Sequence, residues 1–402
     1  MKIWIVSEYY YPIVTSTGYY ITEIAEYLAE KGMEIHVICT GANYNEKEQI
    51  DVKRNEIYHG VYIHRVLTHN IDKNSFLKRL CRLIWASWCL FVKILLNIRK
   101  EDTLLVVTNP AFLLLFIPWV KKIKKIHYIL LVHDICPENL VAIGQLKENS
   151  AIYRYLKQMF DKAYTKADMC ISIGRDMSEI IKVKTQEKTP VIFIPNWADN
   201  DEVFPMDKKH TSMYQQVDTQ GKFVFQFAGN LGHLQGLDNI LSSITLIDNE
   251  NLCFIFIGGG AKYNLIQEFS KTHQNVFAIG FQDRSLQNDF LNACDVAIVT
   301  LSDGMYGLGV PSKSYNIMAA GKPILFVGDM NSEIALCIKE HTLGWVVEPN
   351  SPETLKEAFE LIYKQRDNLS LYQQNARNVA TNIYSKQVIL EKYYYLFLMQ
   401  QM

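Results

Sequence analysis

Short apolar runs alternate with amphipathic segments along the whole chain, and this alternation restricts the fold more than any other feature. Residues 2–7 (KIWIVS) and 33–39 (MEIHVIC) have the composition of buried strands. Between these runs, apolar residues recur at helical spacing, at Ile21, Ile24, Ala25, Leu28 and Ala29. A strand, a helix and a strand at this spacing predict a βαβ unit, which requires parallel strands and a right-handed crossover.

The alternation continues to residue 198 and restarts after a polar interval. In the first part, further strand-like runs occupy residues 61–66, 103–110, 126–134, 169–174 and 191–197, with helices over Phe76–Leu96 and Tyr153–Ala167. In the second part, the strand-like runs are residues 222–230, 251–260, 276–281, 295–301, 322–328 and 344–348. We therefore predict an α/β chain of two Rossmann-like parallel-sheet domains, 1–198 and 222–380, joined by a linker at 199–221.

Charge and cysteine usage exclude some classes of function. The net charge is −1, so the composition does not indicate a nucleic-acid partner. Residues 1–198 carry 26 Lys and Arg against 20 Asp and Glu, whereas residues 199–402 carry 15 against 22, so the two halves favour different partners. The eight cysteines are scattered without a CxxC pair, which predicts buried free thiols in a reducing compartment.

Two apolar stretches raise the question of a membrane. Thr103–Val120 has no charge, but Asn109, Pro110 and Pro118 interrupt it, so we predict a strand, a turn and a helix rather than a membrane span. Residues 73–100 form a helix with seven Lys and Arg, no acidic residue and two tryptophans, and KKIKK follows at 121–125. This helix is either packed in the core or rests on anionic lipid with its tryptophans at headgroup level.

Glycines and polar residues follow four of the predicted strands in the second domain, at AGNLG (228–232), GGGAKY (258–263), GFQDR (280–284) and GVPSKS (309–314). The carboxyl ends of parallel strands share one edge of the sheet, where ligands bind. Each glycine loop could be a simple turn. Together they favour a phosphate site, at which Lys313 could neutralise a diphosphate. Neither a P-loop nor a strict GxGxxG motif is present.

The order of these motifs resembles retaining glycosyltransferase family 4, with the GT-B fold, and in particular its bacterial exopolysaccharide, O-antigen and capsule branch. The resemblance covers nearly the whole chain. It rests on YYPIVTSTGYYITEIAEYLAEKGMEIHVI, VHDICPE, VIFIPNWAD, FAGNLGHLQGLDNIL and GVPSKSYNIMAAGKPIL. It implies two domains that face each other across a cleft, an acceptor-side first domain, a nucleotide-sugar-binding second domain, and a C-terminal helix (381–402) that crosses back to the first.

The resemblance also assigns roles to residues. The donor diphosphate is expected near Gly229, Asn230, Val310, Pro311, Ser312 and Lys313, and the base near Gly280, Phe281 and Arg284. Asn316 replaces the glutamate that binds ribose in the family, and Gly18 belongs to a loop that reaches the phosphates. His133, Asp134 and Lys313 are the expected catalytic residues, and Ser16, Thr17 and Glu138 the acceptor-side residues, with a helix cap as the alternative role for Glu138. Asp199 and Asp201 form a DxD pattern that we interpret as solvent-facing, and no metal or other cofactor is expected.

The implied reaction transfers a sugar from a nucleotide-diphosphate sugar, a UDP-sugar, to a saccharide acceptor linked to a prenyl diphosphate, with retention at the anomeric carbon. The donor phosphate would deprotonate the acceptor, and Lys313 would stabilise the leaving diphosphate. The expected location is the cytoplasm, at the inner face of the membrane, with contact through residues 73–100 and 121–125. Two alternatives remain open: a catalytically degenerate partner subunit that binds sugar nucleotide, and a UDP-sugar 2-epimerase.

Overall fold

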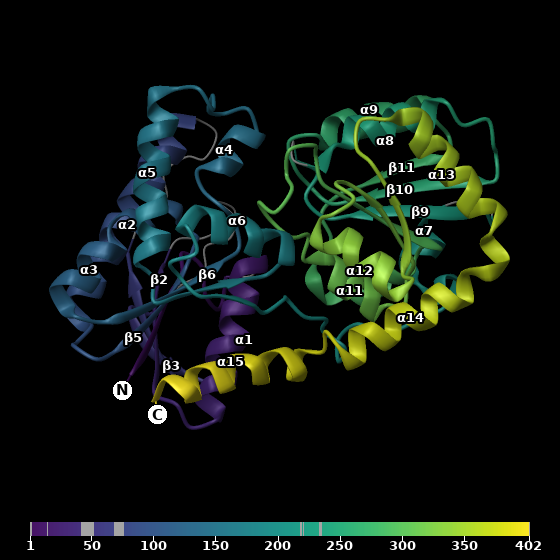
Figure 1. The fold of residues 1–402 in the computed structure, drawn as a ribbon. Helices are drawn as coiled ribbons and strands as arrows, with labels where there is room; N and C mark the ends of the chain where they lie inside the picture. Colours follow the sequence, from purple (N-terminus) through teal and green to yellow (C-terminus); the bar gives the residue numbers. More distant parts are fainter. Residues whose placement is uncertain are drawn as a thin grey trace. The chain divides into compact units, whose positions relative to one another are not determined.

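The computed structural model divides the chain into two compact units, which are described separately (Figure 1). It describes residues 2–13, 15–41, 52–67, 76–217, 219, 221–232 and 235–401. Unit 1 runs to Pro195 and includes Gly307–Gly309 and the chain from Leu390 onward, and unit 2 comprises Asn196–Tyr306 and Val310–Ile389. The stretch expected to be a linker (199–221) differs from that expectation, because Val203, Met213 and Val217 are buried in the core of unit 2.

Unit 1 contains an eight-stranded sheet in the order β3-β4-β2-β1-β5-β6-β7-β8. The strands are β1 (Ile3–Val6), β2 (Ile35–Thr40), β3 (Asn55–Tyr58), β4 (Val61–Val66), β5 (Thr103–Val107), β6 (His127–Val132), β7 (Met169–Ser172) and β8 (Val191–Phe193). All neighbouring pairs are parallel except β3 with β4, an antiparallel edge pair that the sequence analysis did not predict. The β1, β2 and β5 backbones are buried along their whole length, as strands covered on both faces require.

The helices of unit 1 are α1 (Ser16–Glu30), α2 (Phe76–Asn97), α3 (Ile117–Lys124), α4 (Glu138–Ala142), α5 (Ala151–Lys166) and α6 (Arg175–Thr185), with the 3-10 helix η1 (Ala111–Leu115) before α3. The predicted apolar face of α1 is confirmed, since Ile21, Ile24, Ala25 and Leu28 are buried. The stretch Thr103–Val120 forms β5, η1 and the first half of α3, so the predicted strand, turn and helix are also confirmed.

Unit 2 contains a six-stranded parallel sheet in the order β11-β10-β9-β12-β13-β14. The strands are β9 (Phe223–Ala228), β10 (Leu252–Ile257), β11 (Val276–Ile279), β12 (Val296–Thr300), β13 (Ile324–Val327) and β14 (Gly344–Val347). Successive residues of β9 enter different cores: Phe225 and Phe227 pack on one face, and Val224 and Ala228 on the other. This alternation explains why the strand is apolar at every position except the buried Gln226.

The helices of unit 2 are α7 (Ser212–Gln216), α8 (Leu237–Thr245), α9 (Tyr263–Thr272), α10 (Gln287–Asn292), α11 (Lys313–Ala319), α12 (Glu333–His341), α13 (Pro352–Lys364) and α14 (Leu369–Asn382). Figure 1 shows α8 and α9 on one side of the sheet and α11 and α12 on the other. The last helix, α15 (Lys386–Gln401), begins in unit 2, and from Leu390 it belongs to unit 1, where Tyr393 and Phe397 are buried. Six of the eight cysteines are buried, and all eight are free thiols, as predicted.

Candidate functional site

Two glycine loops pack directly against each other at the carboxyl edge of the unit 2 sheet. Gly229, after β9, donates its N–H to Ile257 O at 2.9 Å, and Gly258, after β10, donates to Ile279 O at 3.0 Å. A Cβ added at Gly258 would lie 1.9 Å from the carbonyl oxygen of Gly229, and Gly258 has φ +137°. Only glycine fits there. The Gly229 N–H already donates to Ile257 O, so it is not available to a ligand. The glycine would instead allow a ligand to approach the backbone closely, because it has no side chain.

Lys313, the first residue of α11, extends over the β9 loop. Its Nζ lies 3.5 Å from the centroid of the Phe227 ring, and a Cβ added at Gly229 would lie 3.5 Å from the same atom. The side chain is half-buried, and this desolvation lowers the pKa of Lys313 to about 7. Among the described residues, no carboxylate lies within ion-pair distance of Lys313. An ammonium group held in this way can bind an anion at the sheet edge.

The residues expected around Lys313 lie at the same edge. Ser312 is the half-buried N-cap residue of α11, and Val310 and Pro311 directly before it are half-buried. Asn230, after Gly229, is exposed. The loop after β11 begins with the half-buried Gly280 and continues with Phe281, whose side chain is 77% exposed. An exposed phenylalanine beside a polar loop provides an apolar surface on which a ring can stack.

Asn316 and Arg284 meet at Asp199. The Asn316 Oδ1 atom accepts the backbone N–H of Asp199 at 2.9 Å, and its Nδ2 donates to Gln287 Oε1 at 3.2 Å. Arg284 Nη2 lies 3.4 Å from Asp199 Oδ2. Asp199 is only 6% exposed, so the prediction that it faces solvent was wrong. The cause is the long-range contact with Asn316, which places the polar stretch after residue 198 against α11.

In unit 1, His133 and Asp134 directly follow β6 at the carboxyl edge of the sheet. Thr108, after β5, accepts both backbone N–H groups through its Oγ1, at 3.1 and 3.2 Å. His133 is buried, with Nδ1 at 3.5 Å from Thr17 Oγ1, and burial lowers its pKa to about 4. The ring is therefore neutral at pH 7. Thr108 was not predicted, although a threonine directly after a buried strand would have been the signal.

Asp134 is exposed as a residue, but the surrounding protein desolvates its carboxyl in part. This partial desolvation raises its pKa to about 6. Its backbone forms an antiparallel bridge with Gly309, which belongs to the same unit. At pH 7 the neutral His133 ring can donate one hydrogen bond and accept another, whereas the ionised Asp134 carboxylate can only accept.

The N-terminus of α1 is capped by a side chain from the residue directly before the helix. Thr15 caps the helix by accepting the Gly18 N–H through Oγ1 at 3.0 Å. A Cβ added at Gly18 would lie 2.9 Å from both Ile13 O and Thr15 Oγ1, so glycine is required for packing. The Gly18 N–H is thus taken up by the cap, whereas Ser16 is exposed and Thr17 half-buried. Of the three residues predicted in this loop, Ser16 and Thr17 present side chains and Gly18 shapes the turn.

Glu138, the first residue of α4, belongs to an ion-pair network. Its carboxylate accepts from Lys184 at 2.7 and 2.9 Å and from Lys157 at 3.1 Å, and both lysines also contact Asp161. The Lys184 side chain is 1% exposed. Glu138 of α4 thus pairs with Lys157 of α5 and with Lys184 of α6, so the network joins three helices. Removal of one partner would leave a buried charge unpaired, which would be destabilising.

A buried ion pair that the sequence analysis did not predict follows β1. Glu8 accepts from Arg82 of α2, and their exposures are 1% and 8%. Tyr9 lies beside both, and its pKa is raised, first by burial and then by Glu8. Two signals in the sequence point to this pair. A glutamate directly follows a buried strand, and one arginine interrupts an apolar helical stretch.

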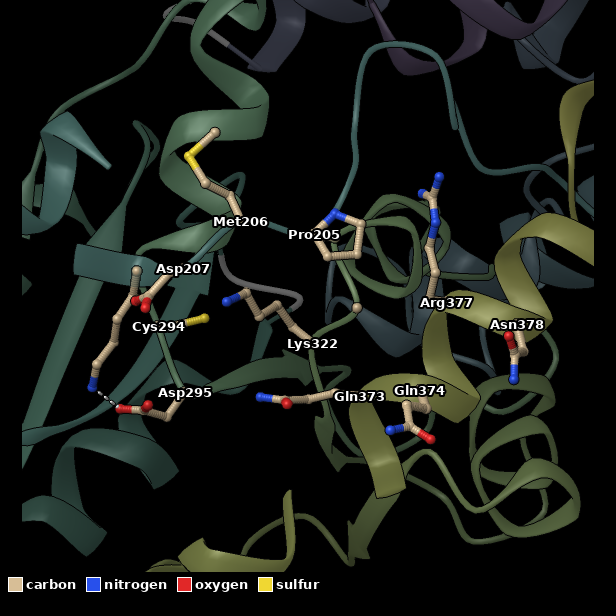
Figure 2. A pocket seen from close by; sticks show the side chains of 13 residues that line it. Pro205, Met206, Asp207, Cys294, Asp295, Lys322, Gln373, Gln374, Arg377 and Asn378 are labelled. Atoms are coloured by element: carbon tan, nitrogen blue, oxygen red, sulfur yellow. Dashed lines mark hydrogen bonds and ion pairs between the residues drawn. The ribbon is translucent and has the colours of Figure 1, made fainter. Parts of the chain in front are cut away.

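A cavity of unit 2, of about 720 Å³, lies at the opposite edge of the sheet (Figure 2). It is lined by Asp295, directly before β12, and by Lys322, two residues before β13. Figure 2 shows Lys322 extending toward Cys294, while Lys208 pairs with Asp295 at 2.5 Å. Lys322 is 6% exposed, and desolvation lowers its pKa. None of the predicted donor residues lines this cavity. In the described ranges, no group of three or more His, Cys, Asp and Glu side chains is arranged to hold a metal ion.

Comparisons with known proteins define the class. Residues 17–202 match the family model Glycosyltransferase Family 4, and residues 209–379 match Glycosyl transferases group 1. With two parallel-sheet α/β units, the chain is a GT-B glycosyltransferase and belongs to the family 4-like glycosyltransferases. The predicted fold class is thereby confirmed.

Two relatives and one solved structure illustrate the similarity. WbjE of Pseudomonas aeruginosa, named as a probable glycosyltransferase, is 40% identical over 324 residues, 80% of each chain. WcaI of Escherichia coli K12, whose name places it in colanic acid biosynthesis as a glycosyl transferase, is 25% identical over 372 residues, 88% of this chain and 90% of that protein. The structure of Anabaena Alr3699/HepE in complex with UDP superposes with a TM-score of 0.73 at 13% identity, over 99% of this chain and 100% of that one.

Proposed function

We propose that the chain transfers a sugar from a UDP-sugar to a saccharide acceptor, and that the donor diphosphate binds at the carboxyl edge of the unit 2 sheet. The observation that carries this proposal is the position of Lys313. Its ammonium group is half-buried, lies over the loop at Gly229 and has no carboxylate partner among the described residues. A diphosphate would supply the missing negative charge, and charge-assisted hydrogen bonds of this kind are among the strongest in proteins.

The remaining donor contacts follow from the same edge. Phe281 would stack on the base, and Asn230 and Ser312 would contact the diphosphate. Asn316 is engaged with Asp199 and Gln287, so in this proposal it supports the ribose site rather than binding ribose with both polar atoms. The choice of uridine is supported by the fold similarity to Alr3699/HepE, which has been solved with UDP.

The reaction proposed is transfer with retention at the anomeric carbon. His133, neutral at pH 7, would contact the donor sugar, and Asp134, Ser16 and Thr17 would lie on the acceptor side. The donor phosphate would take the acceptor proton, and Lys313 would stabilise the charge that develops on the leaving diphosphate. No metal ion is needed in this scheme, and full activity in EDTA would support it. Glu138 and Gly18 would act by shaping unit 1.

The acceptor proposed is a saccharide on a lipid carrier, used at the inner face of the cytoplasmic membrane in the assembly of a surface polysaccharide. The name of WcaI, which refers to colanic acid biosynthesis, supports this role, and so does the exposed aromatic surface of unit 1 described below. Product analysis by NMR after transfer from an α-linked donor would test retention, because an inverted product would contradict it.

Calorimetry tests the donor site directly. UDP, GDP and ADP are titrated into the wild type, Lys313→Ala and Lys322→Ala. Lys322 is a matched control, because it is also a lysine of unit 2 whose pKa is lowered by desolvation, but it lies at the other edge of the sheet. We expect UDP to bind most tightly, with a loss of about 1.5–3 kcal/mol in Lys313→Ala and none in Lys322→Ala.

Activity assays on the same proteins distinguish an enzyme from a non-catalytic subunit. Turnover of UDP-sugar in the presence of acceptor supports the enzyme, whereas UDP binding without turnover would favour the degenerate partner subunit. If no nucleotide binds, or if Lys313→Ala binds UDP as the wild type does, the donor-site assignment is wrong.

A further inference from the structure

Helix α2 has two apolar faces, although only one of them packs on unit 1. The inner face is buried against the sheet and η1, with Ala86, Leu90 and Ile94 at most 1% exposed. The outer face repeats at intervals of three and four residues and is exposed over more than three helical turns, at Ile84, Trp85, Trp88, Val92 and Leu96. The two tryptophans are 48% and 46% exposed, and Leu96 is 77% exposed. Lys78 is exposed near the start of α2, but none of the exposed residues from Ile84 to Leu96 is charged, which is unusual for a surface in contact with water.

Helix α3 extends this apolar surface. Trp119 and Ile123, one turn apart, are 60% and 64% exposed. Phe116 joins the two helices, because its ring lies 5.8 Å from the ring of Trp88, and α2 packs against α3. We call the exposed apolar residues of these two packed helices the aromatic face. It consists of Ile84, Trp85, Trp88, Val92, Leu96, Trp119 and Ile123.

Basic residues lie next to the aromatic face, at the end of α3 and just after α2. Lys122 and Lys125 are exposed beside Ile123, Lys124 is half-buried next to them, and Arg99 is exposed at the end of α2. In the described part of the chain, no carboxylate lies within ion-pair distance of Lys122, Lys124 or Lys125. The one charged side chain on the inner side of α2, Arg82, is paired with Glu8 and so does not contribute. The surface is therefore apolar and aromatic at its centre and basic at its rim.

We propose that the aromatic face binds an anionic lipid bilayer, with α2 lying in the plane of the headgroups. Tryptophan favours the boundary between headgroups and acyl chains, and basic residues are attracted to anionic headgroups. Of the helices described, one stretch, Leu80–Asn97 of α2, is long and apolar enough to cross a membrane. Its inner face packs on unit 1 and carries the buried Arg82–Glu8 pair, so binding along the surface keeps that core intact.

The inference deepens the proposed function, since a lipid-linked acceptor would be reached from this surface, but it is tested without donor or acceptor. Flotation uses vesicles of phosphatidylcholine alone and vesicles with one third phosphatidylglycerol, at low and physiological salt. We expect binding to the anionic vesicles and much weaker binding to the neutral ones. Lys122→Glu/Lys125→Glu should weaken binding by at least about fivefold for each position.

Two further variants test the apolar part. Trp85→Ser/Trp88→Ser and Trp119→Ser/Ile123→Ser should each lose most of the binding at low salt while folding normally, because these side chains are exposed. Leu246→Ser/Leu371→Ser is the matched control, since both leucines are exposed on unit 2, at 45% and 56%. Circular dichroism and UDP binding show that each variant is folded. A variant that binds UDP but not vesicles therefore separates this inference from the donor site.

Tryptophan fluorescence reports where the protein touches the vesicle. Trp4 and Trp197 are buried, and Trp85, Trp88 and Trp119 are the exposed tryptophans of the described chain. Vesicle binding should shift the emission to the blue, and lipids brominated near the headgroup should quench it. The proposal is overturned if the wild type does not bind anionic vesicles at low salt. It is also overturned if ultracentrifugation shows a dimer that the tryptophan variants abolish while vesicle binding is absent.

Discussion

The Nζ atom of Lys313 lies 3.5 Å from the centroid of the Phe227 ring, an arrangement that holds a cation at the sheet edge and leaves its charge without a carboxylate partner in the described residues. Burial lowers the pKa of Lys313 to about 7. The free protein is therefore expected to hold this lysine partly neutral at physiological pH. An anion that binds beside Lys313 favours the charged ammonium form of the lysine and therefore raises its pKa.

This relationship predicts that UDP binding takes up a proton above pH 7. Between pH 7.5 and 9 the lysine is mostly neutral in the free protein and charged in the complex, so UDP affinity should fall as pH rises. The phosphate groups of UDP are already ionised in this window, since a phosphate has its second pKa near about 6. Calorimetry in buffers of different ionisation enthalpy measures the uptake, which should approach one proton and vanish in Lys313→Met. Equal uptake in both proteins would contradict the assignment.

The same pKa shift makes a prediction for the stability of the free protein. Between the folded pKa of Lys313, about 7, and its ordinary value of 10.5, the unfolded chain binds more protons than the folded one. The free energy of unfolding should therefore rise with pH in this window, and this contribution should be absent in Lys313→Met. Urea unfolding of both proteins at several pH values between 7 and 10 gives the difference. A constant difference across the window would indicate that Lys313 titrates normally.

The close packing of the two glycine loops predicts a strong effect of one methyl group. Gly258→Ala would place Cβ 1.9 Å from the Gly229 carbonyl oxygen, at φ +137°, so we expect a loss of roughly 2–4 kcal/mol in the free energy of unfolding. UDP affinity should fall with it, because the loop under Lys313 must move. Gly259→Ala is the control, since no atom lies within 4 Å of its added Cβ. Similar stability of the two variants would show that the loops are not packed in this way.

Elements with a complete apolar pattern could be predicted from the sequence, and those that depend on distant partners could not. The βαβ start, the strands of unit 2 and the helix predicted over Phe76–Leu96, which the structure shows as α2, follow from local composition. The edge strand β3 was missed, because its four residues alternate between exposed and half-buried positions and include polar side chains. An edge strand needs only one partner, so its sequence is less constrained.

The candidate site shows the same division. His133 could be placed because it follows a strand, and Lys313 because it begins a helix in a glycine- and proline-bearing stretch, while their roles came from the family resemblance. The burial of Asp199 was not predicted, since three polar residues in succession (Asp199 to Asp201) give no local signal of burial. Its partner Asn316 is 117 residues away, and the Glu8–Arg82 pair spans 74 residues. Contacts of this length are set by the tertiary structure and have no periodic signature.

The Glu8–Arg82 pair predicts non-additive effects on stability. Arg82→Met leaves a buried carboxylate without its partner, which should cost roughly 3–5 kcal/mol in the free energy of unfolding. Glu8→Gln leaves the arginine unpaired and should also be destabilising. The double variant Glu8→Gln/Arg82→Met should recover much of the loss, because neither charge remains buried. Urea unfolding of the four proteins measures the coupling. Additive losses would show that the two side chains do not depend on each other.

The last prediction concerns Asp134, whose pKa is raised to about 6 by the protein around it. If its carboxylate acts on the acceptor side, kcat/KM should fall as pH decreases through about 6, and Asp134→Asn should lower the rate and remove this step. His133 cannot account for the step, because its pKa is lowered to about 4. His133→Gln should therefore lower the rate but keep the same acid limb.

The free energy of unfolding provides the control for Asp134. As pH falls, titration of Asp134 should stabilise the folded protein, whereas it should lower kcat/KM. Between the ordinary pKa of 3.8 and the folded value of about 6, the folded state binds more protons than the unfolded one, so the cost of the partly desolvated charge disappears as pH falls. Any stability advantage of Asp134→Asn over the wild type should therefore shrink from pH 7 to pH 4, while the activity of the wild type declines. An acid limb that coincides with loss of circular dichroism would instead assign the pH dependence to unfolding.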